Sequence, residues 1–178
     1  MKLFLEGLLP RVLPDLRFLC VTHEGKQDLE RSIPRKLRAW DVPGDQFVIV
    51  RDNDGADCRE LKGRLLDLCG RAGRPESLVR IACQELEAWY FGDLQALAIA
   101  FKKPAVESVA RDRRFREADE ISSPGVELRK LIPEYSKREG ARRMAEALVV
   151  ERNTSRSFQV FLAGLGSMIK AGSGASSP

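Results

Sequence analysis

Two aspartates at the end of an apolar segment are the residues of this chain best suited to chemistry. Residues 46–51 have the Val- and Ile-rich composition of a buried strand, and they pass directly into Asp52, Asn53, Asp54 and Gly55. In an open α/β sheet, ligands bind at the carboxyl ends of the strands. Two carboxylates there predict a Mg²⁺ or Mn²⁺ site, because these cations prefer oxygen ligands. The alternative is that Asn53, Asp54 and Gly55 are only turn formers.

A second acidic pair follows another predicted strand, residues 77–83, where Glu85 and Glu87 begin a helix. If the two strands are neighbours, these glutamates lie level with Asp52 and Asp54. Residues two apart on a helix point about 200° away from each other, so we expect at most one glutamate to face the aspartates. The alternative requires no ligand, because the helix dipole stabilises a glutamate in a first turn.

Basic and hydroxyl side chains supply a candidate phosphate site. Arg152, Ser155, Arg156 and Ser157 surround the predicted start of the last helix, and helix N-termini bind anions. Helix capping is enough to explain the two serines. It does not explain the two arginines, because positive charge is unfavourable at the positive end of a helix dipole, and so they favour contact with an anion. Lys26 lies shortly after a predicted strand at 17–22. In this position we expect it to contact a phosphate or to neutralise developing charge. The alternative is that Lys26 is only an exposed lysine at the start of a helix.

The elements that position these residues alternate between strand and helix in the first half of the chain. Strands are predicted at 17–22, 46–51 and 77–83, and helices at 26–40 and 57–69. This order predicts a mostly parallel sheet flanked by helices. After residue 84 the spacing is helical to about residue 170, which predicts a helical C-terminal half packed on the sheet. We expect one α/β domain over 1–170 and a disordered Gly/Ser-rich tail at 171–178.

Composition restricts the classes of function. The 178 residues carry a net charge of +4, with a pI of about 9.0, which permits binding to nucleic acid. No stretch is long and apolar enough to cross a membrane. Four cysteines without C-x-x-C spacing indicate isolated, reduced thiols in a cytoplasmic protein. With a single histidine, His23, any enzymatic chemistry falls mainly to carboxylates, Lys and Arg.

Taken together, four motifs resemble the domain of unknown function 4276 family over nearly all of the chain. They are His-x-Gly-Lys-Gln-Asp-Leu at 23–29, Val-x-Asp-x-Asp at 50–54, Glu-Leu-Glu-Ala-Trp-Tyr-Phe-Gly-Asp at 85–93 and Arg-Asn-x-Ser-x-Ser-Phe-Gln-Val-Phe at 152–161. That family is similar to the Toprim group, the metal-binding fold of topoisomerases, primases and overcoming-lysogenization-defect nucleases. The resemblance implies a Toprim-like α/β sheet with Mg²⁺ held by Asp52 and Asp54, and an acidic role for Glu87.

The resemblance departs from the Toprim pattern at the start of the chain. Toprim domains begin with a strand ending in a glutamate that acts as acid/base or metal ligand, and Glu6 occupies that place if residues 1–5 form a strand. The spacing of Leu5, Leu8, Leu9 and Val12 instead favours a helix over 3–13, which removes Glu6 from the site. On that interpretation we expect Met1 to be an internal start, with the missing strand encoded upstream in frame.

The sequence therefore predicts a Mg²⁺- or Mn²⁺-dependent phosphodiesterase that acts on nucleic acid, DNA rather than RNA. The resemblance further implies an ATPase partner protein and a role in phage defence. The alternative is a noncatalytic binding or regulatory subunit of a larger complex, or an N-terminally truncated, inactive form.

Overall fold

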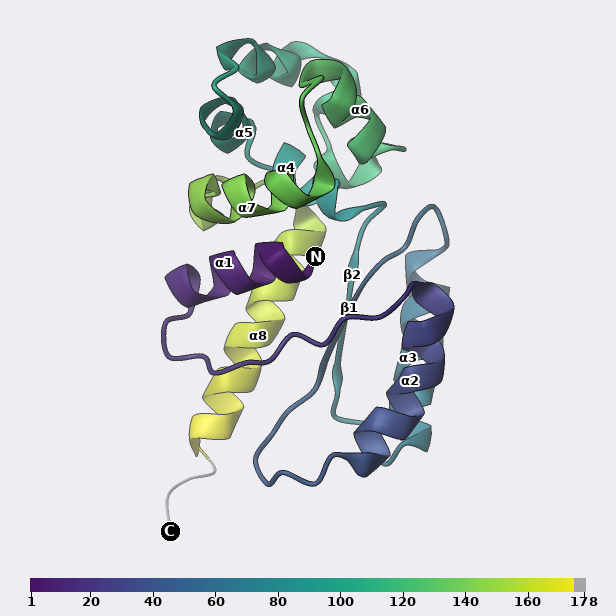
Figure 1. Cartoon of the computed structure of the whole chain (residues 1–178). Helices are drawn as coiled ribbons and strands as arrows, with labels where there is room; N and C mark the ends of the chain where they lie inside the picture. Colours follow the sequence, from purple (N-terminus) through teal and green to yellow (C-terminus); the bar gives the residue numbers. More distant parts are fainter. Residues whose placement is uncertain (175–178) are drawn as a thin grey trace.

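The computed structural model describes residues 1–174, with side chains described to residue 172. Helices dominate, and a short two-stranded sheet lies among them (Figure 1). In chain order the elements are α1 (Lys2–Val12), α2 (Lys26–Ala39), β1 (Val48–Asp52), α3 (Cys58–Arg71), β2 (Leu78–Ala82), α4 (Leu86–Phe91), α5 (Leu94–Phe101), α6 (Pro124–Leu131), α7 (Lys137–Ala147) and α8 (Arg156–Gly174). Four 3-10 helices join them: η1 (Pro104–Arg111), η2 (Arg113–Phe115), η3 (Ala118–Glu120) and η4 (Val150–Arg152).

The sheet consists of β1 and β2, which run parallel with Val48 paired to Leu78 and Asp52 paired to Ala82. The helix α3 connects them, as parallel strands require. Two of the three predicted strands, the predicted helices on either side of them and the parallel pairing are therefore confirmed. The class is α/β, with a smaller sheet than the sequence predicted.

The helices α2 and α3 cover one face of this sheet (Figure 1). Asp57 begins α3 by accepting hydrogen bonds from the backbone N–H groups of Arg59 and Glu60, each at 2.8 Å, which is an N-cap. One stripe of α3 is buried because its apolar residues recur every four positions. The buried cluster comprises Ile33, Leu37, Leu61, Leu65, Cys69, Ala72 and Val79.

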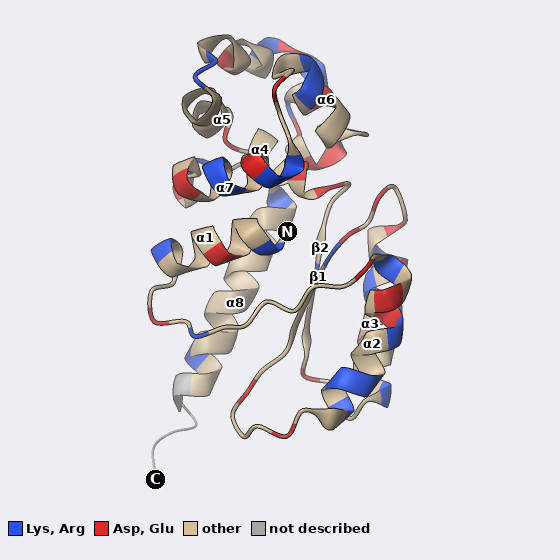
Figure 2. Ribbon diagram, viewed as in Figure 1, with Lys and Arg blue, Asp and Glu red and all other residues tan. Residues whose placement is uncertain are grey.

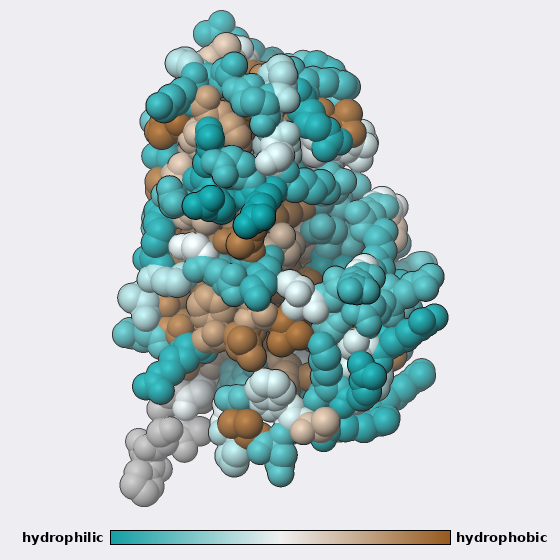
Figure 3. Space-filling model, in the orientation of Figure 1, coloured by the Kyte–Doolittle hydropathy of each residue, from teal (hydrophilic) through white to brown (hydrophobic). Residues whose placement is uncertain are grey.

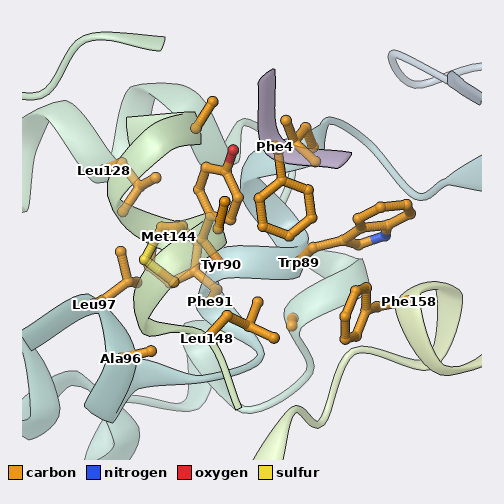
Figure 4. Packing of buried hydrophobic residues seen from close by; sticks show 14 of the residues in the cluster. Phe4, Trp89, Tyr90, Phe91, Ala96, Leu97, Leu128, Met144, Leu148 and Phe158 are labelled. Carbon is orange, nitrogen blue, oxygen red and sulfur yellow. The ribbon is translucent and has the colours of Figure 1, made fainter. Parts of the chain in front are cut away.

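The larger core lies on the other side, where α1, α4, α7 and α8 meet. Phe4 of α1 packs on Trp89 and Tyr90 of α4 (Figure 4). Trp89 also stacks on Phe161 of α8, with ring centroids 5.1 Å apart. Phe4, Trp89 and Tyr90 have no exposed surface. This core confirms that the helical second half packs against the sheet, and α8 contacts β2 directly.

The predicted strand at 17–22 is wrong. In the described part of the chain, no backbone group of residues 17–23 takes part in a backbone hydrogen bond. The segment is an irregular chain between α1 and α2 (Figure 1). Its apolar residues Phe18, Leu19 and Val21 are exposed, Leu19 by 72%, and apolar surface is visible on this face (Figure 3). The residues have a composition typical of a β-strand, but a strand also requires backbone hydrogen bonds to a second strand. Residues 17–22 form no such bonds in the described part of the chain.

The helical interpretation of the first residues is confirmed, because α1 begins at Lys2 and carries Glu6 on an exposed flank. Four residues of the predicted disordered tail, 171–174, belong to α8, and the rest lie outside the described residues. Within the described part of the chain, no helix combines the length and apolarity needed to cross a membrane.

Candidate acidic site

The segments at the carboxyl ends of β1 and β2 are joined to each other and carry the four predicted carboxylates. Asp52 ends β1 and Asp54 lies in the turn after it, whereas Glu85 precedes α4 and Glu87 lies in its first turn. The N–H of Asn53 donates to the carbonyl of Ala82 at 3.2 Å, and the N–H of Asp54 donates to that of Gln84 at 2.9 Å. The buried side-chain carbonyl of Asn53 also accepts from the N–H of Gln84. Asp54 has a left-handed backbone, with a φ of 47°. These residues are thus genuine turn formers, and the turn also places the aspartates.

Asp52 is the most perturbed carboxylate of the site. Its Oδ1 atom is buried and has no hydrogen-bond partner in the described part of the chain. Burial, together with the nearby charges of Asp54 and Glu87, raises the pKa of Asp52 from its ordinary 3.8 to about 7. The amino group of Met1 and Lys137 act in the opposite direction. Asp52 therefore exchanges a proton near neutral pH, which is where acid–base and metal-binding groups operate.

Glu87 is buried, with 3% of its surface exposed, and the hydroxyl of Tyr135 donates to its Oε1 at 2.8 Å. Glu85, just before α4, accepts from the backbone N–H of Gly125 at 2.9 Å. The Nζ of Lys137 lies 3.9 Å from a carboxylate oxygen of each glutamate. Both glutamates therefore face α6 and α7, and Glu87 is the one whose charge acts on Asp52.

Two tyrosines, Tyr90 and Tyr135, belong to the site, although neither was predicted as a site residue from the sequence. Tyr90 has no exposed surface, and its hydroxyl has no hydrogen-bond partner in the described residues. Burial raises the pKa of Tyr90, and the neighbouring Tyr135, Glu87 and Asp52 raise it further. Tyr90 could have been found, because it lies three residues after Glu87 on one helix face. Tyr135 had no such signal, since only the tertiary fold brings it to Glu87.

Positive groups already surround these carboxylates (Figure 2). The Nζ of Lys26 lies 2.7 Å from Asp54. The amino group of Met1 is close enough for Asp52 and Glu87 to raise its pKa, although burial lowers that pKa overall. Together with Lys137, these cations indicate that the negative field of the cluster attracts positive charge. We call Asp52, Asp54, Glu85 and Glu87, with Tyr90 and Tyr135, the acidic cluster.

Glu6 does not join the acidic cluster in any contact of the structure. Its carboxylate pairs with Lys2 at 3.6 Å on the surface of α1, with 40% of the side chain exposed. His23 contacts a different carboxylate, because its Nδ1 lies 3.1 Å from Oδ2 of Asp28 at the start of α2.

The predicted phosphate site at the start of α8 is filled by protein groups. Asp119 of η3 accepts from the Oγ atoms of Ser155 and Ser157, at 2.7 and 2.9 Å, and from the N–H of Ser157 at 2.6 Å. The Oγ of Ser155 also accepts from the N–H of Phe158 at 3.2 Å, as a capping serine does. A protein carboxylate thus stands where the sequence predicted a phosphate.

The two arginines of that predicted site separate. Arg152 binds the buried carboxylate of Asp93 at 3.2 Å. Arg156 is exposed and lines a groove of about 540 Å³ between β2 and α8, together with Arg80.

A comparison with known families places this sequence. Residues 1–166 match the profile described as Domain of unknown function (DUF4276). The chain belongs to this family. No curated protein and no solved structure shows significant similarity to it.

The acidic cluster of this DUF4276 member can be tested for its fit to a divalent cation. Its donors are carboxylate and hydroxyl oxygens, the type that Mg²⁺ and Mn²⁺ prefer. Asp52 Oδ1 and the Tyr90 hydroxyl are buried oxygens without partners. Across the residues that the structure describes, however, no three His, Cys, Asp or Glu side chains are grouped as a ready ligand set. The donor chemistry fits, and the side chains must approach one another to bind the ion.

Proposed function

We propose that this DUF4276 member binds Mg²⁺ or Mn²⁺ at the acidic cluster and hydrolyses phosphodiester bonds in nucleic acid, DNA rather than RNA. One observation carries the proposal. In the described part of the chain, Asp52 has a buried oxygen without a partner and a pKa of about 7, and it lies beside Asp54 of the turn after β1 and Glu87 of α4. A carboxylate kept in such surroundings destabilises the fold unless it binds a proton or a cation.

Asp52, Asp54 and Glu87 would hold the cation. When bound, such an ion polarises a phosphoryl oxygen and lowers the pKa of water. Tyr135 fixes the orientation of Glu87, and the N–H of Gly125 fixes Glu85. Lys26 and Lys137 lie at the exposed rim, with 52% and 63% of their side chains accessible, where each can contact a phosphate.

Binding of a cation requires Asp52 to lose its proton. We therefore expect cation affinity to rise with pH until about pH 7, by up to tenfold per pH unit, and then to level off. The proposal also includes cooperation with an ATPase partner in phage defence. It depends on the Toprim resemblance alone.

A noncatalytic binding or regulatory subunit is the second candidate, and one feature favours it. Two lysines of the protein oppose three of the carboxylates: the Nζ of Lys26 lies 2.7 Å from Asp54, and the Nζ of Lys137 lies 3.9 Å from both Glu85 and Glu87. In that case the ion pairs of the acidic cluster have a structural role and hold β1, α4 and α7 together. The protein then binds its partner through its outer surface.

Calorimetric titration of Mn²⁺ separates the two candidates. The proposed enzyme binds Mn²⁺, loses at least tenfold affinity in Asp52→Asn and keeps it in the control Glu6→Gln, which removes an exposed carboxylate outside the acidic cluster. Cleavage of single- and double-stranded DNA and RNA, with Mn²⁺ or Mg²⁺, should follow the same order. Absence of Mn²⁺ binding at pH 8 refutes the metal-dependent function and leaves the binding subunit.

A further inference from the structure

Two cysteines that are far apart in the sequence meet beside the acidic cluster. Cys58 is the first residue of α3, and Cys83 follows β2 directly. Their Sγ atoms lie 3.6 Å apart. Both residues are half-buried, so a small molecule in solution can reach them. The spacing of the four cysteines predicted isolated thiols, and for this pair that prediction is wrong.

The backbone around the two thiols is held in place by hydrogen bonds. Asn53 bonds to Ala82, and Asp54 bonds to Gln84, so the loop that leads to Cys58 and the loop that contains Cys83 are fixed to each other. A disulfide has an S–S length of about 2.05 Å, so the sulfurs need to approach by roughly 1.5 Å. Rotation of two side chains can supply this approach while the loops stay in place.

We propose that Cys58 and Cys83 form a reversible disulfide when a hydroperoxide oxidises the chain. One thiolate attacks a peroxide oxygen and breaks the O–O bond, which gives a sulfenic acid and hydroxide, protonated to water. The second thiol then displaces the sulfenic oxygen as another water, and the S–S bond forms. Two thiols and one hydrogen peroxide thus yield one disulfide and two waters. A dithiol reductant reverses the bond by thiol–disulfide exchange.

The position of this bond gives it a structural effect. It ties the start of α3 to the end of β2, close to the turn that carries Asp54 and to Glu85 just before α4. It also closes a ring of chain from residue 58 to residue 83 and so restricts the unfolded state. The proposal depends on the two thiols and their loops. It stands whether or not the acidic cluster binds a cation.

The other two cysteines provide the control. Cys20 lies on the irregular segment after α1, and Cys69 is fully buried in α3. In the part of the chain that is described, neither contacts another thiol. A variant with Cys20→Ala and Cys69→Ala keeps only the proposed pair, and adding Cys58→Ser to it leaves Cys83 without a partner.

The test is treatment with hydrogen peroxide, followed by intact mass, peptide mapping without reductant and thermal unfolding. We expect the wild-type chain and the Cys20/Cys69 variant to lose two hydrogens, to yield a peptide linked through Cys58 and Cys83, and to unfold roughly 5–10 °C higher. Dithiothreitol should restore the starting mass. With Cys58→Ser added, we expect no link within the chain to form. Mapping is done on the wild-type chain as well, so poor folding of a variant does not obscure the result. Free Cys58 and Cys83 after oxidation, or links only between chains, would overturn the proposal.

Discussion

Two places in this chain collect carboxylates and hydroxyls, and they differ in whether each polar group has a partner. At the start of α8, Asp119 accepts three hydrogen bonds and both serines are bonded. In the acidic cluster, Asp52 Oδ1 and the Tyr90 hydroxyl are buried and have none in the described residues. Folded proteins leave few buried polar groups unpaired. The start of α8 is therefore a completed structural joint, and the acidic cluster is the better candidate for a ligand site.

The largest effect is expected from breaking the completed joint. Asp119→Ala removes the acceptor of three hydrogen bonds and leaves the donors of Ser155 and Ser157 unpaired. We expect it to lower the free energy of unfolding by roughly 3–5 kcal/mol, since bonds to a charged acceptor are worth more than neutral ones. Chemical denaturation measures this loss, with Glu117→Ala, an exposed carboxylate nearby, as the control. Equal stability of the two variants would show that Asp119 is dispensable and reopen this end of α8 as an anion site.

A substitution in the acidic cluster is expected to have the opposite sign. The pKa of Asp52 is about 7 in the fold and near 3.8 when unfolded, so the wild type loses stability as the pH rises from about 4 to 7. Asp52→Asn removes this penalty. In chelator-containing buffer it should be as stable as the wild type near pH 4, and roughly 2–4 kcal/mol more stable at pH 8. Unfolding curves at both pH values measure it, and a variant that is less stable at pH 8 would contradict the raised pKa.

Within the acidic cluster, Tyr135 and Tyr90 allow a buried hydroxyl with a hydrogen-bond partner to be compared with one that has none in the described residues. Tyr135→Phe removes the donor to buried Glu87 and should cost roughly 1–2 kcal/mol of unfolding free energy. Tyr90→Phe removes a hydroxyl without a partner, and we expect no loss, or a gain of up to about 1 kcal/mol. Both substitutions delete the same atom from a buried ring, so each is the control of the other. A larger loss for Tyr90→Phe would mean that its hydroxyl has a partner in solution.

Local patterns in the sequence were sufficient for part of this molecule. Val48 to Asp52 and Leu78 to Ala82 are short apolar runs that end at turns, and both are strands because each finds the other as partner. The similar run at 17–22 fails, because pairing is a tertiary property that composition does not contain. The turn after Asp52 was also readable from Asn53, Asp54 and Gly55.

The arrangement of the site was only partly predictable. Parallel strands bring their carboxyl ends to one edge, which is why Asp52 and Glu87 could be grouped from the sequence. Tyr135, Lys137 and Asp119 come from segments whose positions are set by packing of the helical half, and no spacing along the chain reports those positions. The same reason explains why Cys58 and Cys83 were interpreted as isolated thiols.

The smallest effect on stability is expected at Arg156, an exposed arginine at the start of α8 that forms no ion pair within the described part of the chain, unlike Arg152. Arg156→Ala should change the free energy of unfolding by no more than about 0.5 kcal/mol. If nucleic acid enters the groove that Arg156 lines with Arg80, the same variant should reduce the salt dependence of DNA binding by about one counterion. Arg35→Ala, which removes an exposed arginine of α2 on the other side of the sheet, is the matched control. Fluorescence anisotropy over a range of salt concentrations measures both slopes. Equal slopes would assign any DNA binding to net charge, whereas a change confined to Arg156 places the nucleic acid along α8 and β2.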